Sequence, residues 1–403
     1  MNILVLNCGS SSVKYKLIDV DSKKTLAEGG VEKVGLPGSF LKFKLPDGEK
    51  KTIEMPIPDH KKAINDILNI LTDPTYGCIK SFDEINAVGH RVVHGGEKFN
   101  KSVKIDDEVI EKIKECYDVA PLHNPANMTG IEAITELMPG VPQVAVFDTA
   151  FHQTMPKEAY MYALPYELYE KYAIRRYGFH GTSHRYVSRR ACDFLGLPYD
   201  KQRVITCHIG NGGSITAVLD GKSVDTSMGL TPVEGLMMGT RVGDVDPGAL
   251  TFIMDKEHLT TKELSDLINK KSGVAGISGI SSDMRDIDAA IEKGDERAKL
   301  ALDMYIYRII KYVGAFAAVL NGVDVIVFTG GVGENQQILR KRVCDHLTYM
   351  GVKIDDEVNF SSRGEEKLIS APDSAVKVVV IPTDEELMIA RDTEAIVNGR
   401  QPE

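Results

Sequence analysis

Three short turns rich in glycine, serine and asparagine have the composition of phosphate-binding loops. They span Gly9–Ser12, Gly210–Gly213 and Gly330–Gly333. Backbone N–H groups in such turns can close on phosphate oxygens, because no large side chain stands in the way. The third turn precedes an expected helix beginning near Glu334 or Asn335, whose positive end would add to the exposed amides. One such turn is often only structural, whereas three in one chain favour phosphate chemistry.

Two arginines, Arg91 and Arg241, lie among apolar residues and glycines, where little water is expected. A guanidinium group in such surroundings needs an anionic partner. The partner is either a carboxylate of the protein, in a structural ion pair, or a bound carboxylate or phosphate, which the forked geometry of arginine suits. The sequence alone leaves both interpretations open.

Three histidines are further candidates. His180 and His184 have the spacing of a zinc-binding pair, but a zinc site would need this pair in mid-helix with a third ligand, and residues 181–183 resemble a helix start. A donor to a phosphoryl oxygen therefore fits His180 better, and a structural role fits His184. His123 precedes an expected helix and could be either a cap or a ligand.

Two carboxylates follow apolar runs. Asp148 ends the run Val144–Phe147, and burying a carboxylate there without a partner would cost several kcal/mol, so a functional role is favoured. Glu385 is expected at the first turn of a helix over Glu385–Arg391. It could simply complement the helix dipole, but the phosphate chemistry that the turns favour also needs Mg²⁺ held through oxygen ligands, which favours a functional role.

Short apolar runs bounded by turn residues predict the strands that position these groups. The runs are Ile3–Leu6, Ile85–Val93, Val144–Phe147, Val204–Cys207, Val323–Phe328 and Val376–Ile381. Helical periodicity is clearest from Asp295 to Leu320, and a second helix is expected after Thr182 and Ser183, running to Gly196. This alternation predicts an α/β protein whose ligands collect at the carboxyl ends of parallel strands, so that one cleft could hold all these groups.

The chain also contains a weak internal repeat. Ile3–Asp19 reads as a strand, a Gly/Ser turn and a second strand, and Val204–Asp220 repeats this order about half a chain later. A duplicated domain that begins with a β-hairpin is the simplest explanation.

Composition and missing motifs exclude several classes of function. A net charge of −10 argues against a nucleic-acid or anionic-membrane partner. The chain lacks the P-loop, protein-kinase and complete dinucleotide-binding motifs. The six cysteines are scattered, no apolar stretch is long enough to span a membrane and no secretion signal is recognisable, so a cytoplasmic protein is expected.

Taken together, the motifs resemble those of the acetate kinase family, within the superfamily of actin, sugar kinases and Hsp70. The resemblance runs from end to end and is carried by residues 7–14, 89–96, 120–127, 146–152, 177–184, 208–214, 238–244, 328–335 and 382–386. One departure is Asp384, where the family has asparagine; it adds a negative charge beside Glu385.

The resemblance implies a role for each set of residues. Mg²⁺, or Mn²⁺ in its place, would be positioned by Asn7 and Glu385. Arg91 would hold the acetate carboxylate, with Val93, Leu122, His123 and Pro232 around the substrate. His180 and Arg241 would stabilise the transferring phosphoryl group, and Asp148 would be the catalytic carboxylate. ATP or ADP would be bound by Ser10, Ser12, Lys14, His208, Ile209, Gly210, Asn211, Gly212, Asp283, Met284, Arg285, Gly331, Val332, Gly333, Glu334 and Asn335.

The same resemblance implies duplicated RNase H-like (actin-like ATPase) domains, with mixed, largely parallel sheets and a cleft that closes between them. The expected domains are residues 1–149, with 386–403 returning to them, on the acetate and phosphoryl side, and residues 150–385 on the nucleotide side. A homodimer is also implied. Because acetate is already ionised at neutral pH, no general base is needed, and Asp148 is expected to orient Arg, metal or water.

Other functions are compatible with these residues. The same chemistry on propionate or butyrate would differ by one or two methylene groups, which a hydrophobic pocket distinguishes by only about 1–3 kcal/mol each. A nucleotide-gated clamp like Hsp70 or actin, and a hydrolase of polyphosphate or phosphate esters, are the alternatives from other classes. Acetate-dependent ADP formation would distinguish the kinase from both.

Overall fold

The computed structural model describes residues 1–45 and 48–402. The chain divides into two compact units: unit 1 comprises Met1–Gln153 and Asp384–Glu403, and unit 2 comprises Thr154–Thr383. Glu385, which was expected at the end of the second domain, thus belongs to unit 1. Residues 46–47 and 403 fall within the predicted N-terminal domain but lie outside the described residues. In the described part of the chain, no helix has the length and apolarity to cross a bilayer.

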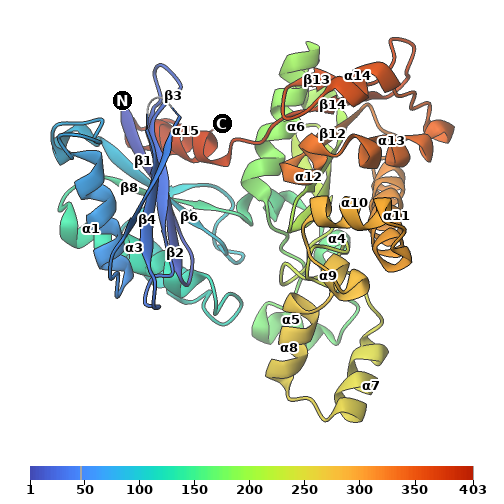
Figure 1. The fold of residues 1–403 in the computed structure, drawn as a ribbon, viewed down its shortest axis with the longest axis horizontal. Coiled ribbons are helices and arrows are strands. Elements are labelled where there is room, and N and C mark those ends of the chain that lie inside the picture. Colours follow the sequence, from blue (N-terminus) through green and yellow to red (C-terminus); the bar gives the residue numbers. More distant parts are fainter. Residues whose placement is uncertain (46–47, 403) are drawn as a thin grey trace. The chain divides into compact units, whose positions relative to one another are not determined.

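Unit 1 is built on an eight-stranded mixed sheet with the strand order β5-β4-β3-β2-β1-β6-β8-β7 (Figure 1). Its strands are β1 (Asn2–Cys8), β2 (Ser12–Asp19), β3 (Lys24–Glu32), β4 (Phe40–Lys44), β5 (Lys50–Glu54), β6 (Ala87–Val92), β7 (Val103–Lys104) and β8 (Gln143–Phe147). Its helices are α1 (His60–Leu71), α2 (Asp107–Lys114), α3 (Asn124–Leu137) and α15 (Glu385–Val397). Strand β1 is antiparallel to β2 but parallel to β6, which is parallel to β8.

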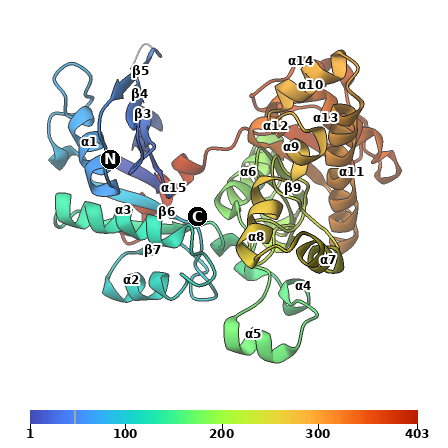
Figure 2. The ribbon, with the colours of Figure 1, turned by 60° about the horizontal axis from the view of Figure 1, so that its bottom comes forward.

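Different helices cover the two faces of this sheet (Figure 2). Successive residues of a strand point to opposite faces. Leu4 and Leu6 accordingly pack in the cluster that contains α1 and α3, whereas Ile3 and Val5 pack against α15. Because both faces are buried, β1 reads in the sequence as a continuous apolar run rather than an alternating one.

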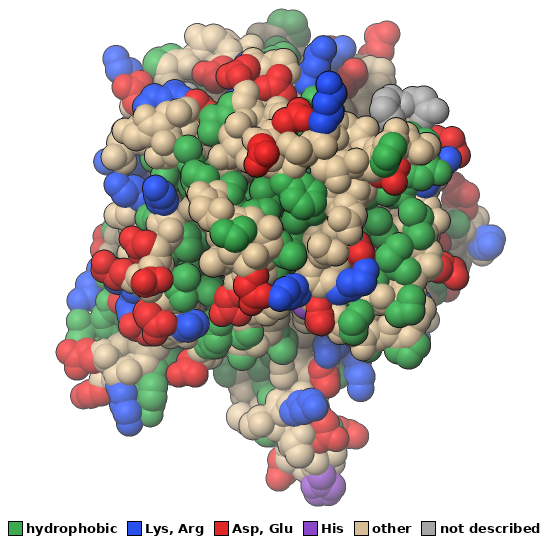
Figure 3. Space-filling view, turned by 90° about the vertical axis from the view of Figure 1, so that its left-hand side faces the viewer, with side chains coloured by type: hydrophobic (Ala, Val, Ile, Leu, Met, Phe, Trp, Pro, Cys, Tyr) green, Lys and Arg blue, Asp and Glu red, His purple; other side chains and the backbone are tan. Residues whose placement is uncertain are grey.

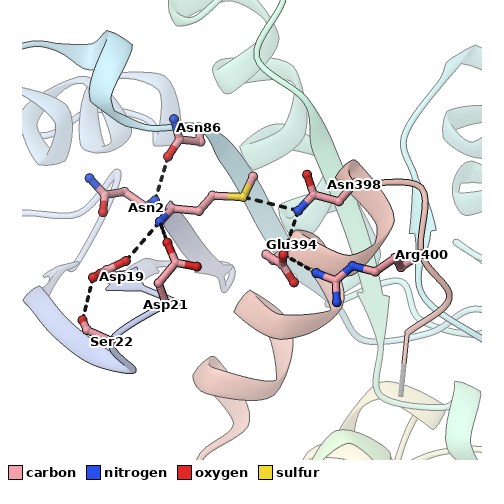
Figure 4. A network of polar contacts seen from close by, with 9 residues as sticks. Asn2, Asp19, Asp21, Ser22, Asn86, Glu394, Asn398 and Arg400 are labelled. Carbon is pink, nitrogen blue, oxygen red and sulfur yellow. Dashed lines mark hydrogen bonds and ion pairs between the residues drawn. The ribbon is translucent and has the colours of Figure 1, made fainter.

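Helix α15 is tied to the N-terminus of the chain. The amino group of Met1 donates to Asp19 Oδ1 at 3.1 Å and also bonds to Asp21. Asn398, which follows α15, contacts Met1 Sδ at 3.9 Å and donates to Glu394 Oε1 at 2.7 Å (Figure 4). These contacts help to hold α15 on unit 1. Because Glu385 is the first residue of α15, it is held there as well.

Unit 2 is built on a six-stranded mixed sheet with the order β11-β10-β9-β12-β14-β13 (Figure 1). Its strands are β9 (Arg203–Ile209), β10 (Gly213–Leu219), β11 (Lys222–Thr226), β12 (Val325–Thr329), β13 (Lys367–Leu368) and β14 (Lys377–Val380). Its helices are α4 (Lys157–Tyr160), α5 (Tyr166–Tyr172), α6 (Gly181–Leu195), α7 (Pro247–Glu257), α8 (Thr261–Lys270), α9 (Gly273–Ser278), α10 (Met284–Glu292), α11 (Glu296–Val319), α12 (Gly330–Asn335), α13 (Gln337–Asp345) and α14 (Asp356–Ser361).

The two sheets share one topology, which confirms the internal repeat. The order β3-β2-β1-β6-β8 in unit 1 corresponds to β11-β10-β9-β12-β14 in unit 2. In both sheets the first three strands of the series form an antiparallel meander, and the next two add in parallel. The hairpins close with Cys8 opposite Val13 and with Ile209 opposite Gly213.

The predicted helices form, but two of them begin earlier than expected. Helix α11 is capped by the Asp295 side chain, and the chain leaves it through Asn321 at a φ of 52°. Helix α6 begins at Gly181 rather than after Ser183. Helix α12 begins at Gly330, so the start predicted near Glu334 or Asn335 is wrong. Glycines have low helix propensity, which hid the fact that this turn is itself helical.

Candidate active site

In unit 1, the face of the sheet covered by α15 brings several predicted residues together. Asn7 of β1 is paired with Lys14 of β2. Leu6 is paired with His90 of β6, so the next residue of each strand, Asn7 and Arg91, lies on the opposite face from that pair, beside α15. Glu385 begins α15 on this same side. The residues predicted for metal, nucleotide phosphate and acetate are therefore neighbours within unit 1.

Asp148 follows β8 and binds Arg91. Arg91 Nε donates to Oδ1 at 2.9 Å and Nη2 donates to Oδ2 at 2.6 Å. The Asp148 side chain is only 3% exposed, whereas that of Arg91 is 26% exposed. The charge of Asp148 is the largest cause that raises the pKa of Arg91, so the guanidinium is firmly cationic. The anionic partner expected for Arg91 is thus a carboxylate of the protein.

Glu385 lies in an unfavourable place for a charge. Burial raises its pKa to about 7; the Arg91 charge opposes this shift, and Asp148, Glu386 and Asp384 add to it. The extra carboxylate of Asp384 caps α15 by accepting from Leu387 N at 3.0 Å. Lys16 Nζ lies 3.9 Å from Asp384 Oδ1 and 3.6 Å from Glu386 Oε2. A lysine therefore accompanies the acidic departure from the family motif.

The residues predicted around the substrate methyl group differ in burial. Val93, directly after β6, is 9% exposed, whereas Leu122 is 72% exposed. His123 occupies the N-cap position of α3, but its side chain makes no capping hydrogen bond, so the capping interpretation of this side chain is wrong.

Two buried asparagines at the start of α3 fix the segment that carries Val93. Asn127 Oδ1 accepts from Val93 N at 3.0 Å and its Nδ2 donates to Cys8 O at 2.8 Å, which links this segment to the end of β1. Asn124 exchanges hydrogen bonds with the backbone of His94. Both asparagines lie in a motif used above, but their positioning role requires contacts that the sequence does not display.

Each of the three predicted phosphate turns uses its first amide internally. Gly9 N donates to Ser12 O at 2.8 Å, and Gly210 N donates to Gly212 O at 3.0 Å. Gly330 N donates to Glu334 Oε1 at 2.9 Å. These amides shape the turns, so only the N–H groups that follow them would be available to a phosphate.

In unit 2, Arg241 and His180 converge on the second turn. A Cβ atom added to Gly212 would lie 3.2 Å from Arg241 Nη1 and 3.7 Å from His180 Nε2. Arg241 Nη1 donates to Pro232 O at 3.1 Å and contacts Met238 Sδ at 3.7 Å. No ion pair joins Arg241 to a carboxylate within residues 1–45 and 48–402, and burial lowers its pKa. A cation in this situation favours the binding of an anion.

The histidines of unit 2 form a connected group. His180 Nδ1 lies 2.9 Å from Ser214 Oγ, and His184 Nε2 lies 2.7 Å from the same oxygen. His184 Nδ1 lies 2.6 Å from Thr206 Oγ1, so both of its ring nitrogens have hydrogen-bond partners, as a structural histidine requires. The ring of His208 stacks on His180 at 4.2 Å. Ser214, which the sequence analysis did not single out, holds the His180 ring by its Nδ1, and the Cε1–Nε2 edge of the ring faces Gly212.

A cavity of about 730 Å³ opens beside this turn, within the size range of small-molecule sites. Of the predicted nucleotide-binding residues, it is lined by Gly210, Asn211, Asp283, Met284, Arg285, Gly331, Val332 and Asn335. Its remaining lining includes Tyr305, Asp288, Gln336 and Arg363, which the sequence analysis did not single out. Tyr305 is recognisable only in the fold, where its hydroxyl donates to Gly210 O at 3.2 Å.

Several predicted nucleotide-binding residues do not line this cavity. Ile209 and Gly333 are buried, the former in the main apolar core of unit 2. Glu334 directs its carboxylate back to the strand ends, where Oε1 accepts from Gly330 N and, at 3.1 Å, from Thr383 N. Ser10, Ser12 and Lys14 belong to unit 1.

The residues present suit a hard divalent cation. Mg²⁺ prefers oxygen ligands and is commonly held by one or two carboxylates, substrate phosphates and water. Asn7 and Glu385 provide an amide oxygen and a carboxylate. Nowhere in the described residues, this site included, are three or more His, Cys, Asp or Glu side chains grouped as a metal site, so phosphate and water would have to complete the coordination.

Comparisons with known proteins identify the family. A sequence model of the acetokinase family matches residues 2–391. Acetate kinase from Parabacteroides distasonis is 65% identical over 99% of this chain and 100% of its own. The crystal structure of Porphyromonas gingivalis acetate kinase, 62% identical, superposes with a TM-score of 0.96 over 98% of this chain and 99% of that chain.

A second solved structure, of a propionate kinase from Francisella tularensis, is 44% identical with a TM-score of 0.90, again over 98% of this chain and 99% of that one. These matches confirm the predicted duplicated α/β fold. Each match spans nearly the full length of this chain and of the related protein. The motifs that carry the resemblance are likewise spread along the whole chain. The chain belongs to the acetokinase family.

Proposed function

We propose that this protein catalyses the reversible, Mg²⁺-dependent transfer of the γ-phosphoryl group of ATP to acetate, which yields acetyl phosphate and ADP. The observation that supports this most directly is the convergence of Arg241 and His180 on Gly212, beside a cavity of nucleotide size. The acetate kinases that match this chain over its whole length point to acetate as the acceptor.

The unit 2 residues would bind the nucleotide and neutralise the phosphoryl group. The cavity would take the nucleoside, and the turn Gly210–Gly213 would lie along the phosphates. Arg241 and a proton on His180 Nε2 would then meet the negative charge that spreads over the transferring group. Interactions of this kind act mainly by positioning and charge stabilisation, which dominate phosphoryl transfer.

The unit 1 residues would present the acetate. Arg91 retains donor capacity beyond the two N–H groups that Asp148 occupies, and this would bind the acetate carboxylate. Val93 would contact the methyl group. Since acetate is ionised at neutral pH, its oxygen needs no base to become a nucleophile; Asp148 would hold Arg91 in place rather than remove a proton.

Mg²⁺ would be held by Glu385 and Asn7 together with phosphate oxygens. Bound there, the metal would supply positive charge against the triphosphate. Asp384 adds negative charge at this end of α15, and Lys16 partly compensates for it. The nucleotide phosphates would also attract Lys14.

Propionate is the second candidate acceptor, because a propionate kinase is 44% identical to this chain. Purified protein with Mg²⁺ and ATP should be offered acetate, propionate, butyrate or no acid, while ADP and acyl phosphate are measured in parallel. We expect the highest kcat/KM with acetate and equal amounts of both products. ADP formation without added acid would instead indicate a hydrolase or a clamp. A higher kcat/KM with propionate than with acetate would identify propionate as the preferred substrate.

We also propose that the protein is a cytoplasmic homodimer that does not bind nucleic acid. The six cysteines are free, as in proteins of a reducing compartment. On the face shown in Figure 3, basic and acidic side chains are interspersed rather than segregated. Light scattering coupled to size-exclusion chromatography tests the dimer: a mass near 44.3 kDa at micromolar concentration would contradict it.

A further inference from the structure

A partly buried polar cluster in unit 2 has no role in the site described so far. It consists of Tyr162, Arg176 and Glu234. Arg176 Nη2 donates to Glu234 Oε1 at 2.7 Å, and the Tyr162 hydroxyl donates to Glu234 Oε2 at 2.5 Å. The Arg176 and Glu234 side chains are 17% and 33% exposed. Both carboxylate oxygens thus have partners, and one of these hydrogen bonds is to a cationic donor, which makes it strong.

This cluster shapes the loop Gly229–Gly235, which carries Pro232. Leu230 N donates to the Tyr162 hydroxyl at 2.9 Å. A Cβ atom added to Gly229 would lie 2.0 Å from Glu234 Oε2 and 2.2 Å from the Tyr162 hydroxyl. The backbone of Gly229 therefore passes directly over the carboxylate, and only glycine leaves enough room at that point.

The loop in turn contacts Arg241 and the segment that leads to His180, the two residues that converge on Gly212. On one side, Pro232 O accepts from Arg241 Nη1 at 3.1 Å. On the other side, Gly229 O accepts from Tyr177 N and Gly178 N, both at 3.2 Å. These two residues lead directly to His180, which adopts a φ of 55° at the N-cap of α6.

Arg176 adds a third set of bonds. Its Nη1 donates to the carbonyl oxygens of Thr226, Ser227 and Met228, at 2.8, 3.0 and 3.1 Å. The end of β11 and the two residues that join it to the loop are thereby bound to the same guanidinium that holds Glu234. One carboxylate consequently sits at the junction of the sheet, the Pro232 loop and the segment before His180.

We propose that Glu234, held by Arg176 and Tyr162, is a positioning residue for phosphoryl transfer, because it fixes the loop that sets Arg241 and His180 relative to each other. This rests on the proposed function. Glu234 acts through the loop and does not touch the substrate. A displacement of about 1 Å at a reacting centre can lower the rate by about 100-fold, so a modest relaxation of the loop is enough to be measured.

The test is Glu234→Gln, which keeps the shape and removes the charge. We expect kcat to fall by about 10- to 100-fold, while KM for ATP changes by less than about threefold, because the nucleoside cavity is lined by other residues. Tyr162→Phe removes one hydrogen bond and should lower kcat by a smaller factor. It also serves as the second variant if Glu234→Gln does not fold.

The matched control is Glu366→Gln. It breaks a comparable two-bond pair of unit 2, in which Arg190 donates to both oxygens of Glu366 at 2.6 and 2.7 Å. This pair lies outside the site, so kcat should stay within about twofold of the unsubstituted protein. Equal losses of kcat in Glu234→Gln and Glu366→Gln would show a general effect of lost ion pairs and overturn the proposal.

A second readout does not depend on acetate turnover. Orthovanadate, a phosphoryl analogue, should bind the ADP-loaded Glu234→Gln protein about tenfold or more weakly in calorimetry, because Arg241 and His180 no longer converge. Unchanged vanadate affinity, or unchanged kcat in the ADP-binding fraction, would reduce Glu234 to a structural residue. If the unsubstituted protein formed ADP without acetate, the proposed function would fail, whereas the vanadate comparison would still decide this inference.

Discussion

Asp148 binds Arg91 through both of its carboxylate oxygens, so the residue predicted to be catalytic holds the residue predicted to grip acetate. The pair lies within unit 1, with Asp148 almost fully buried and Arg91 reaching toward solvent. A two-bond pair fixes the plane of the guanidinium. Asp148 is thereby suited to orienting Arg91. This agrees with the expectation that Asp148 does not act as a general base, because acetate is already ionised at neutral pH.

We predict that Asp148→Asn will fold but lose about 10²- to 10⁴-fold in kcat. The amide cannot match both N–H groups of Arg91, and one of its own N–H groups would face the guanidinium. The expected cost in unfolding free energy is about 1–3 kcal/mol. Steady-state kinetics and urea denaturation measure the two effects.

The control for this substitution is Asp324→Asn, which weakens the similar pair with Arg203 in unit 2. It should leave kcat within about threefold, because the pair is more exposed and lies away from the site. If Asp148→Asn unfolded most of the protein while the soluble fraction turned over normally, Asp148 would be a structural residue only.

Arg91→Ala and Arg241→Ala should differ in kind. Arg91 would hold a charge that acetate already carries before reaction, so its loss should raise KM for acetate by about tenfold or more. Arg241, which is bound to no carboxylate among the described residues, would meet charge that develops during transfer. Its loss should mainly lower kcat, by about 100- to 1,000-fold. Identical changes in both parameters for the two variants would refute this division of labour.

Val93→Ala should enlarge the acetate pocket and improve propionate relative to acetate by up to about 10- to 100-fold in kcat/KM. Val93 is nearly buried and its backbone is fixed by Asn127, so the space lost by the side chain remains open. Leu122→Ala should change the ratio less, because Leu122 is largely exposed. Val88→Ala, elsewhere on β6, controls for loss of stability. An unchanged ratio in Val93→Ala would mean that this side chain does not touch the substrate.

Glu385→Gln should stabilise the metal-free protein at alkaline pH. The pKa of Glu385 is raised from 4.5, the value of an ordinary glutamate, to about 7 in the folded protein. Between these two pH values the unfolded chain loses the Glu385 proton more readily than the folded protein does, so the free energy of unfolding falls as pH rises. Above pH 7 the penalty is about 3 kcal/mol at most. Urea unfolding in EDTA should therefore give similar midpoints for both proteins at pH 4.5 and a higher midpoint for the variant at pH 8. A difference between the two proteins that does not vary with pH would contradict this.

Much of the fold could be predicted because it depends on local composition. Runs such as Ile3–Leu6 and Val144–Phe147 are apolar throughout, since strands buried on both faces need no polar side. Glycine, serine and asparagine mark the turns that follow, and Asp295 caps α11 through a hydrogen bond to its own first turn. The repeated strand–turn–strand order is also local, and it was enough to predict the duplicated topology.

The roles of individual charged groups were decided only by the tertiary structure. Arg91 and Arg241 look alike in the sequence, yet one pairs with Asp148, 57 residues away, and the other has no carboxylate partner among the described residues. Glu385 joins unit 1 although it follows the last strand of unit 2 in the chain. Electrostatic environment depends on distance in space and on exclusion of water, and neither is encoded by spacing along the chain. The sequence by itself therefore determined which groups are available for chemistry, and the packing of the two sheets and their helices decided which charges are paired.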